Sequence, residues 1–208
     1  MTEFNLIPIT LSIIVITSLI SILGFTNHEV KNKMIFYPYG MRTPSEYYRF
    51  ISHGLIHADF IHLFFNMFTL YSFGGFVEQY LFNRTEFIVL YVTALIAASV
   101  FDFIKNRNNS GYAALGASGA VSAIIFASII FDPWIKGVVL FGIPNLAIPN
   151  IAFAILYVWY CIYMGKRGGD NIGHNAHLWG GIYGFAFTAL LRPDLFKEFL
   201  IKLMHPHF

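Results

Sequence analysis

The chain has 208 residues, of which 57% are hydrophobic and only 12% are charged. A soluble domain carries about 25% charged residues, so this composition excludes an ordinary soluble protein and predicts a polytopic membrane protein. The net charge of +2 comes with no basic patch or tail, so we expect no nucleic-acid partner. The single cysteine, Cys161, excludes an internal disulfide and any multi-cysteine metal site.

Six apolar segments predict an all-α bundle of six transmembrane helices, at roughly 20 residues per span. The first begins without a positively charged start or a clear cleavage site, so we interpret it as a retained span and not as a signal peptide. A polar connection of more than 20 residues follows it, and long loops of this kind are usually functional or mobile. No internal repeat is visible, so we expect one membrane-embedded domain over residues 1–208. The predicted spans cover about residues 5–25, 60–82, 86–104, 115–131, 150–164 and 176–191.

Ser118 lies near the start of the fourth span and His177 lies near the start of the sixth. Polar or ionisable side chains inside a membrane segment are costly, which makes both residues functional candidates. A serine hydroxyl becomes an effective nucleophile when a base removes its proton, and histidine is the usual base near neutral pH. A helix that starts inside the bilayer has unpaired backbone N–H groups, so both starts are expected to line a water-filled cavity.

Small residues predict that these two spans pack closely against each other. Gly180 and Gly184 form a Gly-xxx-Gly face on the sixth span, and Gly119 with Ala123 forms a matching face on the fourth. Such faces let two helix backbones approach each other in a membrane. Helix packing alone would explain the glycines, but the same contact would also bring the serine and the histidine together.

His62 and Asn66 are four residues apart and therefore share one face of the second span. In the catalytic interpretation both donate hydrogen bonds to an oxyanion, together with the backbone N–H of Ser118. Two alternatives remain open: a satisfied polar network between helices, and a metal site formed by the His53, His57 and His62 cluster. The metal alternative lacks the His-Glu-xx-His pair that would supply two ligands and a general base, so we expect neither a metal nor a cofactor.

Two charged residues and one loop complete the set of candidates. Glu78 is interpreted as a structural carboxylate at a helix end, and Arg49 as an anchor of the first loop that binds backbone carbonyls. The glycine-rich residues 165–175 form a candidate lid over the site. Asp170 in this loop is the carboxylate nearest to His177 in sequence, and we infer a Ser–His dyad without it.

Taken together, these motifs resemble the rhomboid family of intramembrane serine proteases. The resemblance covers about residues 48–191, in the order and spacing of the family. It rests on the run from Tyr48 to Asn66, the motif Gly74-Gly75-Phe76-Val77-Glu78, the Gly-x-Ser-Gly motif at 116–119 and the Ala-His-xx-Gly-xxx-Gly motif at 176–184.

This resemblance implies a six-helix rhomboid-like core in which Ser118 is the nucleophile and His177 is the general base and then the general acid. The implied oxyanion hole contains His62, Asn66 and the Ser118 N–H. The residues implied as structural support are Gly116, Gly119, Gly180, Gly184, Arg49 and Glu78.

Two positions depart from the family pattern. Tyr48-Arg49 replaces the usual Trp-Arg of the first loop. Ser122 stands where the family often has an aromatic ring that stacks on the catalytic histidine, which leaves the support of His177 open.

We therefore expect an intramembrane serine endopeptidase whose partners are single-span transmembrane substrates and the lipid bilayer. Because a helical peptide bond is shielded, substrates should carry weak helix formers near the cut. The alternatives are a non-catalytic protein that binds membrane helices, a metal-dependent membrane enzyme, and a transporter, which would predict internal repeats.

We also expect an integral, multi-pass protein of the bacterial plasma (inner) membrane. The resemblance implies cytoplasmic termini, whereas the distribution of Lys and Arg over the loops mildly favours the opposite orientation.

Overall fold

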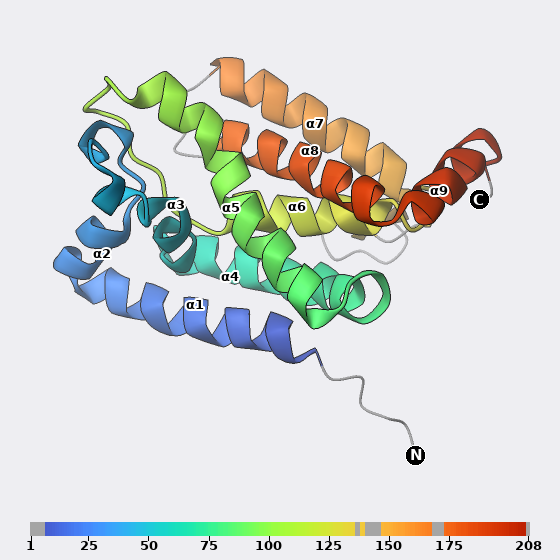
Figure 1. Cartoon of the computed structure of the whole chain (residues 1–208), viewed down its shortest axis with the longest axis horizontal. Coiled ribbons are helices and arrows are strands. Elements are labelled where there is room, and N and C mark those ends of the chain that lie inside the picture. The colour runs from blue at the N-terminus through green and yellow to red at the C-terminus, as the bar shows by residue number, and fades with distance from the viewer. Residues whose placement is uncertain (1–6, 136–137, 140–146, 168–172, 207–208) are drawn as a thin grey trace.

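A computed structural model describes residues 7–135, 138–139, 147–167 and 173–206, most of which belong to helices (Figure 1). The predicted spans coincide with α1 (Pro8–Thr26), α4 (Phe60–Thr69) with its continuations η4 (Leu70–Gly74) and η5 (Val77–Leu81), α5 (Arg84–Asn106), α6 (Ser118–Ile129), α7 (Asn150–Arg167) and α8 (His174–Leu191). The remaining elements are α2 (His28–Met34), η1 (Pro38–Gly40), η2 (Pro44–Glu46), α3 (Arg49–Ser52), η3 (His53–Leu55), β1 (Val138–Val139), β2 (Ala147–Ile148) and α9 (Pro193–Met204). The predicted all-α membrane bundle is confirmed.

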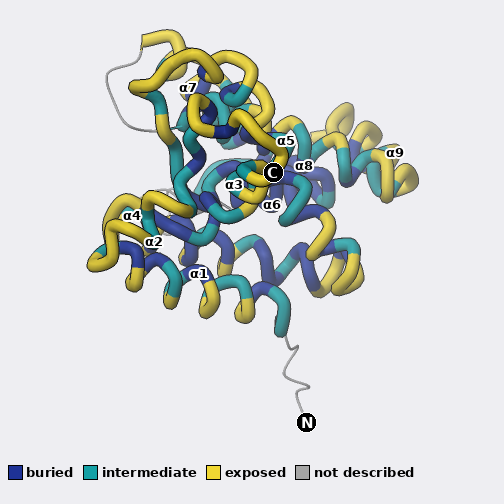
Figure 2. Tube along the Cα trace, turned by 60° about the vertical axis from the view of Figure 1, so that its left-hand side comes forward, coloured by how far each residue is buried: buried dark blue, intermediate teal, exposed yellow. Residues whose placement is uncertain are grey.

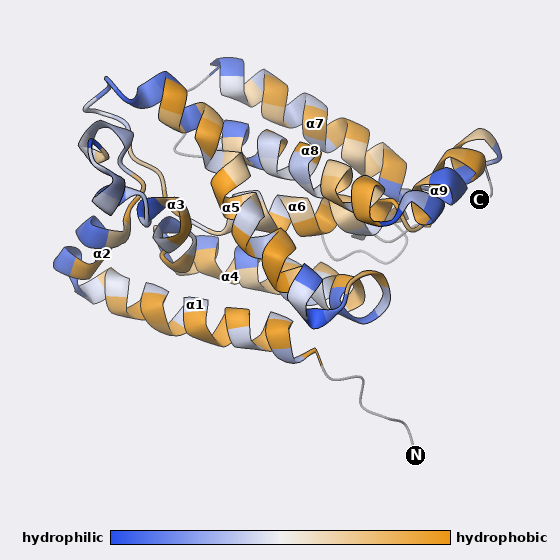
Figure 3. Cartoon of the chain, in the orientation of Figure 1, coloured by the Kyte–Doolittle hydropathy of each residue, from blue (hydrophilic) through white to orange (hydrophobic). Residues whose placement is uncertain are grey.

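Helix α1 has the reverse of the polarity pattern found in a soluble protein. Its buried positions are Thr10, Thr17, Ser21 and Gly24, whereas much of the rest of this hydrophobic helix is exposed (Figures 2 and 3). The exposed large hydrophobic residues of α1 are Leu11, Val15, Ile16, Leu19, Ile22 and Leu23. Exposed aliphatic surface on this scale is unfavourable in water but matches the hydrocarbon of a bilayer. Among the described residues, α1, the segment from Phe60 to Leu81, and α5 are each long and apolar enough to cross a membrane.

Helix α6 is the central element of the bundle (Figure 1). It has 12 residues, and every residue from Gly119 to Ile129 is buried. Helices α4, α5, α7 and α8 all contact it, and its contact with α8 is the most extensive in the structure. A helix that is apolar all around must be covered on every side, so α6 carries its first residue, Ser118, into the interior of the protein.

Glu78 joins the second span to the first. Its carboxylate accepts hydrogen bonds from the backbone N–H groups of Ile9 and Thr10 at 2.9 and 2.8 Å, and from the Thr10 hydroxyl at 2.7 Å. The first N–H groups of a helix have no partner within the helix and carry its partial positive charge. Glu78 therefore caps the start of α1, a different helix from its own.

Arg49 holds the long first loop together. Its guanidinium donates to the carbonyl oxygens of Asn32 and Ile35 at 2.9 and 2.8 Å and pairs with Glu46 at 2.6 Å. The hydroxyl of Tyr48 donates to the carbonyl of Lys33 at 2.7 Å. These bonds fix α3 and η3 against α2, so the segment that leads into the second span has a defined position.

Helices α2, α3 and α9 were absent from the sequence prediction. Helix α2 lies within the predicted polar connection, where the Asn27 side chain caps it by accepting from the N–H groups of Glu29 and Val30. Helix α9 follows α8 directly, because Pro193 ends one helix and suits the first position of the next. The fourth span is also shorter than predicted and begins at Ser118, not at residue 115.

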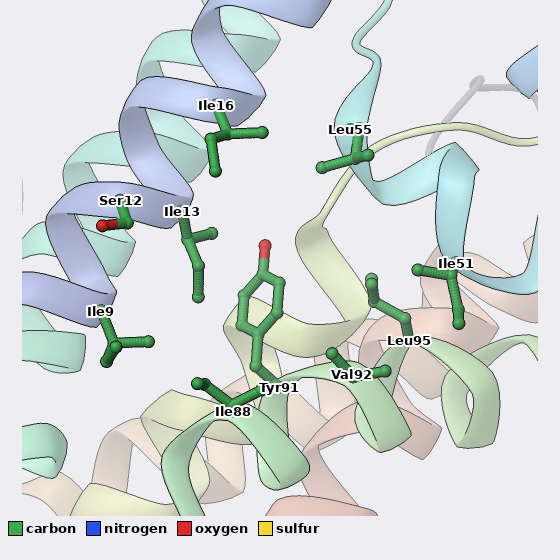
Figure 4. Close-up of a pocket in the computed structure, with 10 residues that line it drawn as sticks. All are labelled: Ile9, Ser12, Ile13, Ile16, Ile51, Leu55, Ile88, Tyr91, Val92 and Leu95. Atoms are coloured by element: carbon green, nitrogen blue, oxygen red, sulfur yellow. The ribbon is translucent and has the colours of Figure 1, made fainter. Parts of the chain in front are cut away.

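An apolar pocket with a volume of about 270 Å³ lies between α1, η3 and α5 (Figure 4). The hydroxyl of Tyr91 points into it from α5. None of the residues predicted to be catalytic lines this pocket, so the candidate site lies elsewhere, at the start of α6.

Candidate active site

Ser118 is the first residue of α6 and follows a loop that is held at several points. Phe36 and Ala114 exchange backbone hydrogen bonds of 2.9 Å in both directions. Gly116 has φ = 112°, a conformation that L side chains rarely adopt. A Cβ at Gly116 would lie only 2.7 Å from Cε1 of His62. Glycine is therefore required here both for the turn into α6 and for the close approach of the His62 ring.

Two buried histidines, His53 and His57, accept hydrogen bonds from the loop that precedes Ser118. The carbonyl of His53 accepts from the Gly116 N–H at 2.9 Å. Nε2 of His57 accepts from the Ala117 N–H at 3.4 Å, so its proton is on Nδ1, which lies 2.9 Å from the hydroxyl of Ser21. Both residues therefore position the turn that presents the serine.

These hydrogen bonds also bear on the metal alternative. Nε2 of His53 lies 3.0 Å from the hydroxyl of Ser99, which donates to the carbonyl of Leu95, so His53 is the donor in that pair. Burial lowers the pKa of His53 to about 4, and burial with the neighbouring His62 lowers that of His57 to about 3. Both rings are neutral at pH 7, but their nitrogens are engaged in hydrogen bonds within the protein, so a metal site formed by His53, His57 and His62 is not favoured.

The starts of α6 and α8 are in backbone contact. A Cβ at Gly180 would overlap the carbonyl oxygen of Gly119, and one at Gly184 would overlap that of Ala123. A Cβ at Gly119 would lie 3.4 Å from the carbonyl oxygen of Ala176. The predicted close packing of the two small-residue faces is thus confirmed. It brings the residue after the serine to the residue before the histidine.

His177 lies in the first turns of α8, half-buried, and its N–H donates to the carbonyl of Gly173 at 3.0 Å. The ring of Tyr157, from α7, stacks on it with centroids 6.2 Å apart and an interplanar angle of 20°. The Tyr157 hydroxyl lies 2.6 Å from that of Ser122, which donates to the carbonyl of Ser118 at 2.8 Å. A single chain of contacts therefore runs from the imidazole to the backbone of the serine.

This arrangement accounts for the departure at position 122. The aromatic ring expected there comes instead from Tyr157 on the neighbouring helix, and the small Ser122 makes room for it and binds its hydroxyl. Sequence reasoning missed Tyr157. The available signal was the serine itself, a hydroxyl in the middle of an apolar helix.

His62 and Asn66 lie on α4, whose start is capped by Asp59 accepting from the His62 N–H at 2.8 Å. The half-buried His62 ring borders Gly116 and lies 4.9 Å from the His57 ring. Asn66 is buried and uses one N–H of its amide to donate to the His62 carbonyl at 3.0 Å. The His62 ring thus lies beside the loop that leads into the serine, with Asn66 one turn further along the same helix.

Asp102 on α5 was not singled out from the sequence, yet it connects the start of α8 with the loop that precedes α6. Its carboxylate accepts from the Asn175 amide at 3.1 Å and from the Tyr112 hydroxyl at 2.9 Å. Burial and this carboxylate raise the pKa of Tyr112 well above its usual range. Asn175 precedes His177 by two residues, so Asp102 positions the start of α8. Asp170 and the other residues of the predicted lid between 168 and 172 lie outside the described residues.

A half-buried serine and a half-buried histidine thus lie at the starts of the two most closely packed helices of a membrane bundle. This arrangement defines a membrane-embedded protein with the parts of a serine hydrolase. The Rhomboid domain family matches residues 44–194, and the chain belongs to the rhomboid family.

Similar proteins carry the same assignment. The chain is 29% identical over 152 residues to Rhomboid protease GlpG of Haemophilus influenzae, covering 73% of each chain. It is 28% identical to RHOMBOID-like protein 12, mitochondrial, of Arabidopsis thaliana, over 71% of this chain and 47% of that protein. Identity to Rhomboid protease GluP of Bacillus subtilis is 26%, over 76% of this chain and 29% of that protein. The chain is therefore a rhomboid-type serine protease, a peptide-bond hydrolase of the membrane.

Proposed function

We propose that Ser118 and His177 form the catalytic dyad of an endopeptidase that cleaves transmembrane proteins. The observation that carries the proposal is the backbone contact between α6 and α8, where Gly119 meets Ala176. Because these residues are the chain neighbours of the serine and the histidine, the packing that stabilises the bundle also assembles the dyad.

The chemistry follows from the positions of these groups. The Ser118 oxygen attacks the carbonyl carbon of the scissile bond while His177 accepts the hydroxyl proton. His177 then gives this proton to the leaving amine, and water attacks the acyl-enzyme with His177 again acting as the base. Stacking on Tyr157 holds the imidazole in place during both transfers.

We propose that the oxyanion is stabilised by the start of α6 together with α4. No side chain caps the described start of α6, and the N–H of a first helical residue has no partner within its helix. The Ser118 N–H and the partial positive charge of the helix end are therefore available to an oxyanion. His62 and Asn66 are proposed as further donors, and Gly116 keeps the His62 ring close to the turn.

The structural residues and the location complete the proposal. We infer that Gly116, Gly119, Gly180 and Gly184 set the backbone contacts, while Arg49 and Glu78 fix the first loop and the first helix.

The protein acts as a single domain over residues 1–208 with its core at about 48–191, where all described parts of the site lie. It is an integral membrane protein, proposed for the bacterial inner membrane with cytoplasmic termini. Its substrates are single-span proteins cut in or near the membrane.

A panel of labelled transmembrane peptides tests the proposal with purified protein in detergent. Cleavage and labelling of Ser118 by a fluorophosphonate are both expected, and both should be absent in Ser118→Ala. Peptides with glycine or proline near the cut should be cleaved faster, because they unwind more easily. Cleavage that persists without Ser118 would overturn the dyad.

A further inference from the structure

A second group of reactive side chains converges on His177. Cys161 of α7 and His174 of α8 each offer one ligand atom, and these atoms lie within 4.8 Å of one another and of a ring nitrogen of His177. Cys161 and His174 are 2% and 4% exposed. His174 precedes His177 by three residues, so both rings share one face of α8, with centroids 6.2 Å apart.

The packing of α7 on α8 brings these groups together. A Cβ at Gly165 would lie 3.6 Å from Cβ of His174, so the end of α7 lies directly against the start of α8. Cys161 is one helical turn before Gly165 and therefore faces the same way. Two histidines and a thiol on two packed helices form a set of ligands that is supported by the fold.

The ligand types favour one class of metal. A thiolate and two imidazoles suit Zn²⁺, whereas Mg²⁺ and Ca²⁺ prefer oxygen ligands. Zinc bonds of about 2.3 Å to sulfur and about 2.0 Å to nitrogen place tetrahedral ligand atoms roughly 3.5 Å apart. The present separations, at most 4.8 Å, require shifts on the order of 1 Å to reach this geometry.

We propose that Cys161, His174 and His177 form an inhibitory Zn²⁺ site that competes with catalysis for the His177 base. Binding forms one Zn–S and two Zn–N bonds, and the thiol proton is released to solvent. A neutral imidazole has one basic lone pair, so zinc on either nitrogen of His177 leaves the other nitrogen carrying its proton. The ring then has no lone pair with which to accept the proton of Ser118. The inhibitory effect rests on the proposed function, but the binding itself does not.

Binding is tested separately from activity by titrating Co²⁺ into the Ser118→Ala protein. Because Cys161 is the single cysteine of the chain, a thiolate-to-cobalt charge-transfer band reports this residue alone. We expect the band in Ser118→Ala, its loss on adding Cys161→Ala, and its weakening on adding His174→Ala. The exposed His28 provides a matched control, since His28→Ala should leave the band unchanged. Absence of a band in the folded protein would overturn the site.

Inhibition is then measured with Zn²⁺ against peptide cleavage by the parent and by Cys161→Ala. We expect the inhibition constant to rise at least tenfold in the variant, since even outer partners of metal ligands contribute about 10–100-fold to affinity. Inhibition should strengthen as the pH rises, because the thiol proton is released on binding. Mg²⁺ should have no effect. Equal inhibition of both proteins would overturn the proposal, whereas a cobalt band without any protease activity would overturn the proposed function and leave the metal site standing.

Discussion

Replacing Tyr157 tests the finding that α7 supplies the aromatic support of the histidine. Tyr157→Ala removes the stacked ring, and aromatic pairs of this kind are worth about 0.5–1.5 kcal/mol beyond their buried area. The greater effect is on geometry, because a misplacement of about 1 Å in the reacting groups lowers the rate by about 100-fold. Tyr157→Phe keeps the ring, and Ser122 still donates to the Ser118 carbonyl. The rate of Tyr157→Phe should fall by only about fivefold, which corresponds to the net value of one hydrogen bond, about 1 kcal/mol.

The assay is the cleavage rate of a fixed transmembrane peptide, separated into kcat and KM. We expect Tyr157→Ala to lower kcat far more than it raises KM, because the ring positions the base and does not bind substrate. Tyr163→Ala is the matched control, since Tyr163 lies exposed on the same helix. Adding Ser122→Tyr to Tyr157→Ala should recover part of the lost rate by returning a ring to the same space. Parental kcat in a folded Tyr157→Ala protein would refute the reasoning.

Three further predictions follow from the site. Gly184→Leu should lower both peptide cleavage and fluorophosphonate labelling by about 100-fold, because the new side chain would separate α8 from α6. Ala186→Leu, on the exposed side of α8, should have no such effect. Equal rates for the two variants would show that helix contact does not assemble the dyad. His62→Ala and Asn66→Ala should each lower kcat by about 10²–10³ with little change in KM, and an effect on KM alone would assign them to substrate binding. The pKa of His57 is about 3 in the folded state and about 6.5 in the unfolded state. Between these values the unfolded state binds more protons, so the free energy of unfolding decreases as the pH is lowered. The contribution of His57 to this loss should be about 2 kcal/mol between pH 7 and pH 5. Denaturation of the parent and of His57→Gln at both pH values measures it, because the variant should lose about that much less stability.

The spans were predictable from the sequence because membrane helices need long apolar runs that composition alone reveals. The close contact of α6 and α8 was also predictable, since Gly119, Gly180 and Gly184 are small at helical spacing and small residues are what close packing in a membrane requires. Helix α9 was missed because Pro193 signals the end of one helix as well as the beginning of another.

Contacts between segments distant in sequence could not be predicted in the same way. Tyr157 looked like one of many aromatics in an apolar helix, and only the packing of α7 against α8 shows which one stacks on His177. The role of Asp102 could not be predicted for the same reason, since its partners Tyr112 and Asn175 come from two other segments. For Cys161 the sequence excluded only a disulfide and a multi-cysteine metal site, and it did not show that the ligand atoms of two histidines lie within 4.8 Å of the thiol.

The central claim is that the Ser118 hydroxyl attacks the peptide bond, and one matched pair of variants tests it directly. Ser118→Ala and Ser128→Ala make the same change in the same helix, and the Ser128 hydroxyl donates to the Ile125 carbonyl of that helix. Cleavage of a transmembrane peptide should fall to background in Ser118→Ala and remain near the parental rate in Ser128→Ala, with both proteins folded. Undiminished cleavage by the Ser118→Ala protein would contradict the account.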